Sequence, residues 1–415
     1  MRAAAPGALF VLIMAQPNLA TGMMPYYRHA WALAPLLITV IFAAYLFALT
    51  PTLSVLGTPP SRRGWWWRIG VGAACGIGAD LAMAVAHSAW PACVARICAG
   101  LSVGLVTGSL AGLILERRGE RGRTAMASAT VVGSALGTIA AAGIAQYLPA
   151  PGATVYVVHA VALGIAALAV LADRAARPAR ATMSGPGGPV AVVEAPAAGY
   201  LSGIAAWVSA GLVVALLPSY GAELLGTANL ALLALPVTLY LVSAWVAQRA
   251  LGPNAIPAEP LSAQVIIIAG IALAAVVSWV PNLALLLCGG VVAGCGQGIA
   301  YRAGLRIVSA ATPPDGHARA ASRYATVAYL CTAVATLGFG AIATAGSMRD
   351  AVLAAVGVLG GGGAGAPPRR PPCPSPPAMR LSPPPLRRPS SFPPSGFGPE
   401  PTLLPQKPTP EMVGG

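Results

Sequence analysis

Apolar segments of about 20 residues follow one another along most of this 415-residue chain, and they limit its fold more than any other feature. A segment of that length spans the hydrocarbon core of a bilayer as one α-helix. Only 9% of the residues are charged and 56% are hydrophobic, which excludes an ordinary soluble domain. The sequence therefore predicts an all-α polytopic protein embedded in the lipid bilayer.

We expect twelve transmembrane helices, of which the last is incomplete. The twelfth apolar segment begins near residue 350 and fails near residue 365. The other expected spans cover residues 8–24, 33–56, 69–88, 92–115, 126–148, 154–172, 201–222, 228–248, 264–281, 283–306 and 325–345.

The arginines between the spans predict the orientation. With a cytoplasmic N-terminus, fourteen arginines fall in inner loops and two, Arg28 and Arg349, fall in outer loops. Basic loops stay on the cytoplasmic side, so this asymmetry favours that orientation. It also accounts for the net charge of +14 without a nucleic-acid partner, because no basic domain with interleaved aromatic residues is visible. The bias toward Arg, Ala, Gly and Pro is typical of a GC-rich bacterial genome, which predicts a bacterial inner-membrane location.

The longest internal loop divides the spans into six and six. We expect an N-terminal bundle over residues 1–172, a cytoplasmic linker over 173–200 and a C-terminal bundle over 201–365. Residues 366–415 contain 18 prolines, which predicts a disordered tail. Two interpretations of that tail stay open: a cytoplasmic interaction segment, or the product of a frameshift, which would leave this chain unstable or inactive.

A glycine pattern indicates that the two halves are copies of one unit. Glycines recur every four residues in the fourth span, and the spacing returns 190 residues later in the tenth. On a helix they form one smooth stripe against which another backbone can pack. At this offset Leu286 corresponds to Arg96. The six glycines are Gly100, Gly104, Gly108, Gly290, Gly294 and Gly298.

The loop after the second span resembles a signature of the major facilitator superfamily of secondary transporters. The signature reads Gly-x-x-x-Asp-Arg-x-Gly-Arg-Arg, and this chain matches it at Gly57, Arg62 and Gly64. Ser61 replaces the acid, and tryptophans replace the last basic pair. The resemblance implies two pseudo-symmetric six-helix bundles. It also implies that this loop takes part in conformational gating, although here without its acid.

Two further spans resemble motifs of the same family. Arg96 precedes the glycine run of the fourth span, where the family has an arginine that is linked to proton coupling. The fifth span has Gly133 and Gly137 spaced as in the drug–proton antiporter signature, without that signature's proline. The resemblance implies proton-coupled transport and favours efflux.

Asp80 is the acid that lies well inside a span, and an ionisable group there is a functional candidate. Helix rise places Asp80 about 12 Å and Arg96 about 6 Å from the outer ends of their spans. A long arginine side chain can bridge that difference. One hypothesis is a proton-sensitive Asp80–Arg96 pair. The alternatives are a static pair, or an aspartate turned toward a polar neighbour.

Three amides complete the candidates for a substrate or proton pathway. Gln16 and Asn18 flank Pro17 in the middle of the first span, and Gln297 lies in the tenth. Each can contact a substrate or bond to a neighbouring helix. His159, in the sixth span, is interpreted as a hydrogen-bonded packing residue.

No nucleotide-binding loop, zinc-site spacing or nucleophile elbow occurs in the sequence. We therefore expect no cofactor, no metal and no enzymatic activity. The favoured function is alternating-access transport of a small molecule, with protons as the coupling ion and efflux as the direction. The alternatives are an uptake permease, and a multispan sensor or scaffold without transport.

Overall fold

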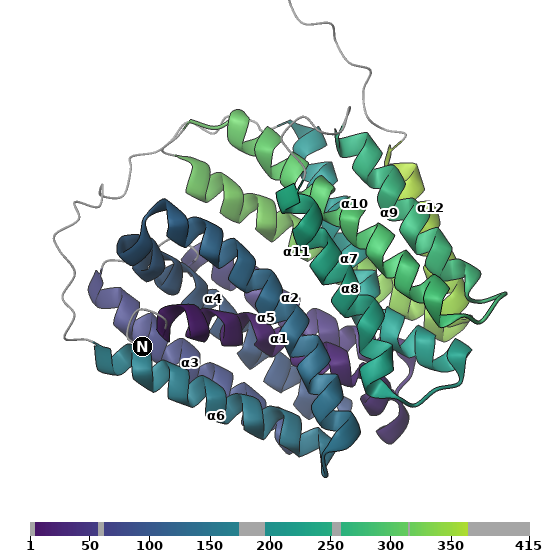
Figure 1. The fold of residues 1–415 in the computed structure, drawn as a ribbon, viewed down its shortest axis with the longest axis horizontal. Coiled ribbons are helices and arrows are strands. Elements are labelled where there is room, and N and C mark those ends of the chain that lie inside the picture. Colours follow the sequence, from purple (N-terminus) through teal and green to yellow (C-terminus); the bar gives the residue numbers. More distant parts are fainter. Residues whose placement is uncertain (1–4, 57–61, 174–195, 251–258, 314–315, 364–415) are drawn as a thin grey trace, which may run out of the picture. The chain divides into compact units, whose positions relative to one another are not determined.

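Twelve α-helices form the described part of the chain in a computed structural model of the protein (Figure 1). The structure describes residues 5–56, 62–173, 196–250, 259–313 and 316–363. In chain order the helices are α1 (Ala5–Ala30), α2 (Pro35–Leu56), α3 (Arg62–Ala84), α4 (Ala89–Arg118), α5 (Glu120–Tyr147), α6 (Pro151–Ala172), α7 (Ala197–Leu225), α8 (Leu230–Ala250), α9 (Glu259–Val276), α10 (Leu283–Ala310), α11 (His317–Ala345) and α12 (Met348–Gly363).

The predicted all-helical fold with twelve helices is confirmed. Helix α12 is described over 16 residues and reaches Gly363, where the described part of the chain ends. Gly57, most of the central linker and the proline-rich segment lie outside the described residues, and so does the side chain of Arg62.

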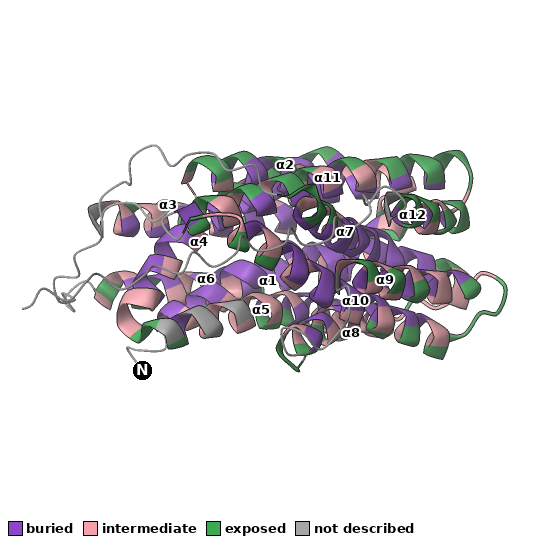
Figure 2. Ribbon diagram, turned by 90° about the horizontal axis from the view of Figure 1, so that it is seen from above, coloured by how far each residue is buried: buried purple, intermediate pink, exposed green. Residues whose placement is uncertain are grey.

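The exposed surface of the described helices is apolar, which suits a lipid environment. Nine of the described helices are long and apolar enough to cross a membrane. Large apolar side chains such as Leu168 and Val265 are well exposed on them. Figure 2 shows exposed positions, in green, along the outer helices. Trp67, Trp90 and Trp279 are exposed close to helix ends, where indole rings meet lipid headgroups. In hydrocarbon the backbone must satisfy its own hydrogen bonds, and a helix does this within one segment.

The first six helices and the last six repeat one packing scheme. Helix α4 packs on α2 and α3, and α10 packs in the same way on α8 and α9. Likewise α1 packs on α5, and α7 packs on α11. Between the sets, α2 contacts α11 and α5 contacts α8. Because α2 corresponds to α8 and α5 corresponds to α11, the repeat converts one of these contacts into the other. Figure 1 shows the first six helices, purple to blue, grouped beside the green last six. The predicted two-bundle architecture is therefore confirmed.

Contacts between the two sets lie near both ends of the helices. We call the end at which α1 begins the N-face, and the opposite end the far face. Near the far face, the backbone N–H of Leu36 donates to Thr344 Oγ1 at 2.8 Å, from α2 to α11. Near the N-face, Ser54 Oγ lies 3.0 Å from Thr326 Oγ1 between the same helices. Helices α2 and α11 are thus in contact near both of their ends.

The glycine stripes of α4 and α10 allow close approach to the helices α2 and α8. A Cβ on Gly100 would lie 2.5 Å from the carbonyl oxygen of Tyr45. A Cβ on Gly294 would meet the carbonyl oxygen of Tyr240 just as closely. Tyr45 and Tyr240 are 195 residues apart, so Gly100 corresponds in packing to Gly294.

The predicted offset of 190 residues between the fourth and tenth spans is therefore wrong by one helical turn. A stripe that repeats every four residues cannot fix its own register, and the contacts give 194. Arg96 then corresponds to Gly290 instead of Leu286. In agreement, Arg96 Nε donates to the Ile41 carbonyl, and a Cβ on Gly290 would lie 2.6 Å from the Pro236 carbonyl, 195 residues after Ile41.

Candidate functional site

A cavity of about 290 Å³ lies between the first six helices and the last six. Its walls come from α1, α2, α4 and α5 on one side and from α7, α8, α10 and α11 on the other. None of its described lining residues is acidic, and Arg96 is the charged residue among them. Besides four tyrosines and Trp207, the polar lining residues are Asn18, Arg96, Thr130, Ser134, Gln248, Gln297 and Thr332.

The structure divides the five predicted pathway residues into two groups. Asn18, Arg96 and Gln297 line the central cavity, as a substrate pathway would require. Gln16 and Asp80 instead border a separate void of about 10 Å³ inside the first six helices. Arg96 borders both spaces. It therefore stands between the cavity and the buried acid.

Arg96 is buried without a carboxylate partner among the described residues. Only 2% of the residue is exposed. Its Nη1 donates to the Pro17 carbonyl oxygen at 2.9 Å, and its Nε donates to the Ile41 carbonyl oxygen at 3.3 Å. The guanidinium also lies over the Tyr45 ring, 4.7 Å from its centroid. Nη2 has no hydrogen-bond partner in the described chain. Neutral groups alone thus hold a buried cation at the cavity.

Aromatic rings from the last six helices form the opposite wall. Trp207 of α7 packs edge-on against Tyr329, with ring centroids 4.5 Å apart, and against Tyr301 at 6.0 Å. All three residues line the cavity. The indole Nε1 of Trp207 is buried and has no acceptor in the described chain. This wall offers ring surface together with an unused hydrogen-bond donor.

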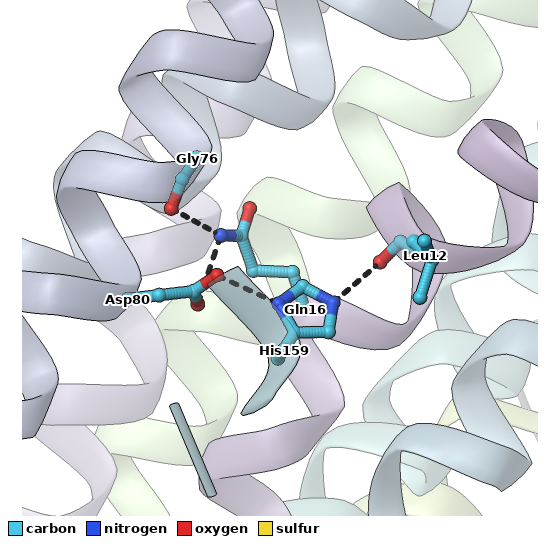
Figure 3. A network of polar contacts seen from close by, with 5 residues as sticks. All are labelled: Leu12, Gln16, Gly76, Asp80 and His159. Carbon is cyan, nitrogen blue, oxygen red and sulfur yellow. Dashed lines mark hydrogen bonds and ion pairs between the residues drawn. The ribbon is translucent and has the colours of Figure 1, made fainter. Parts of the chain in front are cut away.

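Asp80 belongs to a buried polar network of three helices, shown in Figure 3. Its Oδ2 lies 2.6 Å from Nδ1 of His159, which α6 supplies. Its Oδ1 accepts a hydrogen bond of 3.0 Å from Nε2 of Gln16, on α1. The same Gln16 nitrogen donates to the Gly76 carbonyl oxygen at 2.7 Å. Helix α1 also lines the central cavity, so the network contacts one of the helices that form the cavity wall.

The carbonyl oxygen of Leu12 fixes where the protons of this network can be. It lies 3.1 Å from Nε2 of His159, and a carbonyl only accepts, so Nε2 carries hydrogen (Figure 3). A neutral histidine then has a bare Nδ1, which can bond to Asp80 only when the carboxyl is protonated. A charged histidine bonds to the carboxylate instead. In either form an N–H or O–H group donates across the contact between Asp80 and His159.

The predicted ion pair between Asp80 and Arg96 is wrong. Depth along the helices made that pair possible, but the acid points toward α1 and α6, and Arg96 bonds to backbone carbonyls. The alternative of an aspartate turned toward polar neighbours is the observed one. His159, which we interpreted as a packing residue, is its partner. The signal that could have identified it is that both residues lie in the far-face halves of their spans.

A second space, the far-face vestibule, has a volume of about 640 Å³. Between its walls Arg28 Nη2 of α1 lies 2.9 Å from Glu223 Oε2 of α7, an ion pair that remains partly exposed. On α7, Val214 lines the cavity and Ser219 lines the vestibule. These two residues are five positions apart, which corresponds to about 8 Å along the helix. Between these two levels, residues 19–24 of α1 and residues 215–218 of α7 are all buried. We call these two mainly apolar segments the apolar plug.

The described residues contain no group of three His, Cys, Asp or Glu side chains that could hold a metal ion. Their six cysteines are free.

No family model matches the sequence, and no curated protein matches it. Solved structures resemble the fold over nearly their whole length. A bacterial homologue of the human lysosomal transporter Spinster, in an inward-facing and occupied conformation, is 13% identical, with 87% of this chain and 94% of that chain covered and a TM-score of 0.66. The nucleoside transporter NupG is 12% identical, with 86% and 98% covered and a TM-score of 0.64.

A D-xylose–proton symporter is 14% identical, with 86% of this chain and 94% of that chain covered and a TM-score of 0.66. Identities this low concern the fold alone. The TM-scores and coverages show that this chain shares its overall fold with these structures. The chain therefore has the fold of the major facilitator superfamily of secondary transporters, as its sequence motifs predicted.

Proposed function

We propose that this chain is a secondary transporter that moves a small molecule by alternating access. The observation that carries the proposal is a central cavity whose walls belong to two symmetry-related helix sets and which the apolar plug separates from the far-face vestibule. Residues 1–172 and 201–365 act as the two moving units, and 173–200 connects them. Rocking of the units would open the plug and present the cavity to the far face.

The N-face is cytoplasmic in this proposal, because fourteen of the sixteen loop arginines counted in the sequence lie on that side. The far face is then outside the cell. The plug and the Arg28–Glu223 pair lie on the outer side of the cavity, which suits a state that is closed to the outside. The host membrane in this proposal is the bacterial inner membrane.

Protons are the coupling ion that we propose. Support comes from the buried contact between Asp80 and His159 inside the first helix set, because both side chains can bind and release a proton. Loss of a proton shared by the two groups would leave two acceptors facing each other and would weaken the contact. Gln16 and Leu12 tie the pair to α1, whose residues also line the cavity. Arg96 and Tyr156 are the other ionisable groups at the adjoining void.

Efflux is the direction that we propose, on the spacing of Gly133 and Gly137 in α5. Both glycines pack on α1, where a Cβ would meet backbone carbonyls. They therefore also have a packing function, and the direction must be measured. The solved structures of this fold include transporters named for a nucleoside and for D-xylose with a proton.

Purified protein in liposomes with an internal pH dye tests the proposal. Uridine, D-xylose, small carboxylates and toxic hydrophobic compounds are each added under an imposed pH gradient. Movement of one compound class that dissipates the gradient supports proton-coupled transport, and the sign of the proton flux gives the direction. Movement of compounds without protons contradicts the coupling. If no compound moves, the scaffold alternative replaces transport.

A further inference from the structure

We propose that the central cavity selects small organic anions that have a planar, apolar body. This inference rests on the proposed transport function, because it names the substrate class of the same site. It follows from two features that face each other across the cavity, the buried cation Arg96 and the aromatic wall of Trp207, Tyr301 and Tyr329.

The charge of the lining favours an anion. Arg96 is the charged residue among the described lining residues of the cavity. Among the described residues, the Arg96 guanidinium contacts two carbonyl oxygens and one ring face. Removing a guanidinium from water costs several kcal/mol, which carbonyls offset only in part and a carboxylate offsets far better. Asp80, the nearby buried acid, is already bonded to His159 and Gln16. A ligand carboxylate is therefore the missing counter-charge.

The opposite wall favours a flat, apolar body. Trp207 and Tyr329 present ring surface to the cavity, and such rings bind planar groups by stacking and edge contacts. A volume of about 290 Å³ corresponds to a small molecule at the lower end of usual ligand pockets. A cationic substrate would also find aromatic faces here, but Arg96 would repel it.

Trp207 adds polarity to that wall. Its Nε1 is a buried donor without a described acceptor, and a buried unsatisfied donor is unfavourable until an acceptor arrives. An acceptor on the ligand would satisfy it. Arg96 comes from the first helix set and Trp207 from the last, so one ligand with two acceptors would join both sets.

The matched probes 2-naphthoate and 2-naphthamide test this inference on the full chain in detergent. They share one planar body and differ in charge. We expect naphthoate to bind about ten- to hundredfold more tightly, which is the usual contribution of a charge-assisted hydrogen bond. Arg96→Gln should abolish the preference, and Arg96→Lys should retain part of it. Trp207→Phe should weaken naphthoate binding about two- to tenfold, since one neutral hydrogen bond is lost.

Arg302→Gln is the matched control, because it removes an arginine from α10 that does not line the cavity. It should leave the preference for naphthoate intact. Thermal unfolding without ligand checks that each variant is folded, and Arg96→Lys serves if Arg96→Gln is not. Equal binding of both probes, no binding of naphthoate, or a preference that survives in Arg96→Gln overturns the inference.

Flux measurements separate this inference from the proposed function. Anion-selective binding without flux of any compound would contradict transport and leave the anion site standing. Proton-coupled flux of neutral compounds that does not depend on Arg96 would support transport and overturn the anion site.

Discussion

His159 lies within hydrogen-bond distance of Asp80 through Nδ1 and of the Leu12 carbonyl through Nε2, so one imidazole joins the acid of α3 to the backbone of α1. Both side chains are almost completely buried. An ionisable pair at such depth is costly to build, and it is usually found where charge or protons move. Its contacts with α1 join the pair to the helix that carries Asn18 and Pro17 along the cavity.

Asp80→Asn should abolish proton-driven accumulation and spare substrate exchange across liposomes. The amide keeps the shape of the carboxyl but cannot release a proton. We also expect a loss of about 1–3 kcal/mol in stability, because a buried charge-assisted hydrogen bond is replaced. Accumulation under a pH gradient and exchange without one are measured on the same preparation.

Asp350→Asn is the control for Asp80→Asn. Asp350 also carries a carboxylate, but it is exposed near the start of α12 and bonds to Ser347. Accumulation should be unchanged in this variant. Proton-driven accumulation that persists in Asp80→Asn would show that Asp80 carries no coupled proton.

Reversing the charge of Arg28 or of Glu223 should favour a conformation that is open at the far face. The pair joins α1 to α7 at 2.9 Å and is partly exposed, so its contribution is about 1 kcal/mol or less. That energy changes a two-state ratio up to roughly fivefold. The readout is labelling of Met23→Cys, a buried plug position, by a maleimide that does not cross the membrane.

The double variant Arg28→Glu with Glu223→Arg is the internal control. It restores opposite charges, so labelling of Met23→Cys should return toward the original rate. If both single reversals and the double variant label at the original rate, the ion pair does not help to close the far face.

Ala in place of Gly294 should lower the melting temperature of the protein. The new Cβ would lie against the Tyr240 carbonyl and Ser243 Oγ, and α10 would have to move away from α8. Overpacking of this kind costs about 1–3 kcal/mol. Gly100→Ala, the packing counterpart in α4, should be destabilising for the same reason. Thermal unfolding in detergent measures both variants.

Gly143→Ala is the matched control on α5. No atom lies within 4 Å of the position that its Cβ would take. The substitution should be neutral, or should stabilise the protein by about 0.5–1 kcal/mol, because alanine lowers the conformational entropy of the unfolded chain. If Gly143→Ala destabilises the protein as much as Gly294→Ala, helix packing is not the reason for the stripe.

The sequence was sufficient for the fold because hydropathy acts over whole segments. Each apolar segment must form a helix in a bilayer. The alternation of arginine-rich and arginine-poor loops then supports the number of spans. Duplication was also visible, but not its register. The glycine stripes match three pairs at an offset of 190 and two pairs at 194, so the sequence alone favoured the wrong register. The contacts with Tyr45 and Tyr240 were needed to identify 194.

The site was less predictable because it depends on how each helix is rotated. Residue depth gave Asp80 and Arg96 similar levels, yet their side chains point to different neighbours. Gln16 and Asn18 looked equivalent in the sequence, and the structure separates them, with Asn18 at the cavity and Gln16 at Asp80. No periodicity in a helix that is apolar on nearly all sides indicates which face meets which partner.

The different surroundings of Gln16 and Asn18 can be tested by replacing each amide in turn. Asn18 lines the cavity, and Gln16 bonds to Asp80 beside a different space. Asn18→Ala should raise the KM for substrate about two- to tenfold, as expected when one hydrogen bond is lost. Gln16→Ala should leave KM near its original value and reduce proton-driven accumulation, because Asp80 loses a donor.

The two variants control for each other, since both remove an amide from the same part of α1. KM is measured by substrate exchange without a pH gradient, and accumulation is measured with one. The same change in both quantities for both variants would mean that the amides act through helix packing alone. A raised KM in Gln16→Ala would place the Asp80 network in substrate binding. A raised KM in Asn18→Ala alone, together with reduced accumulation in Gln16→Ala, would support a cavity and a proton site on two faces of α1.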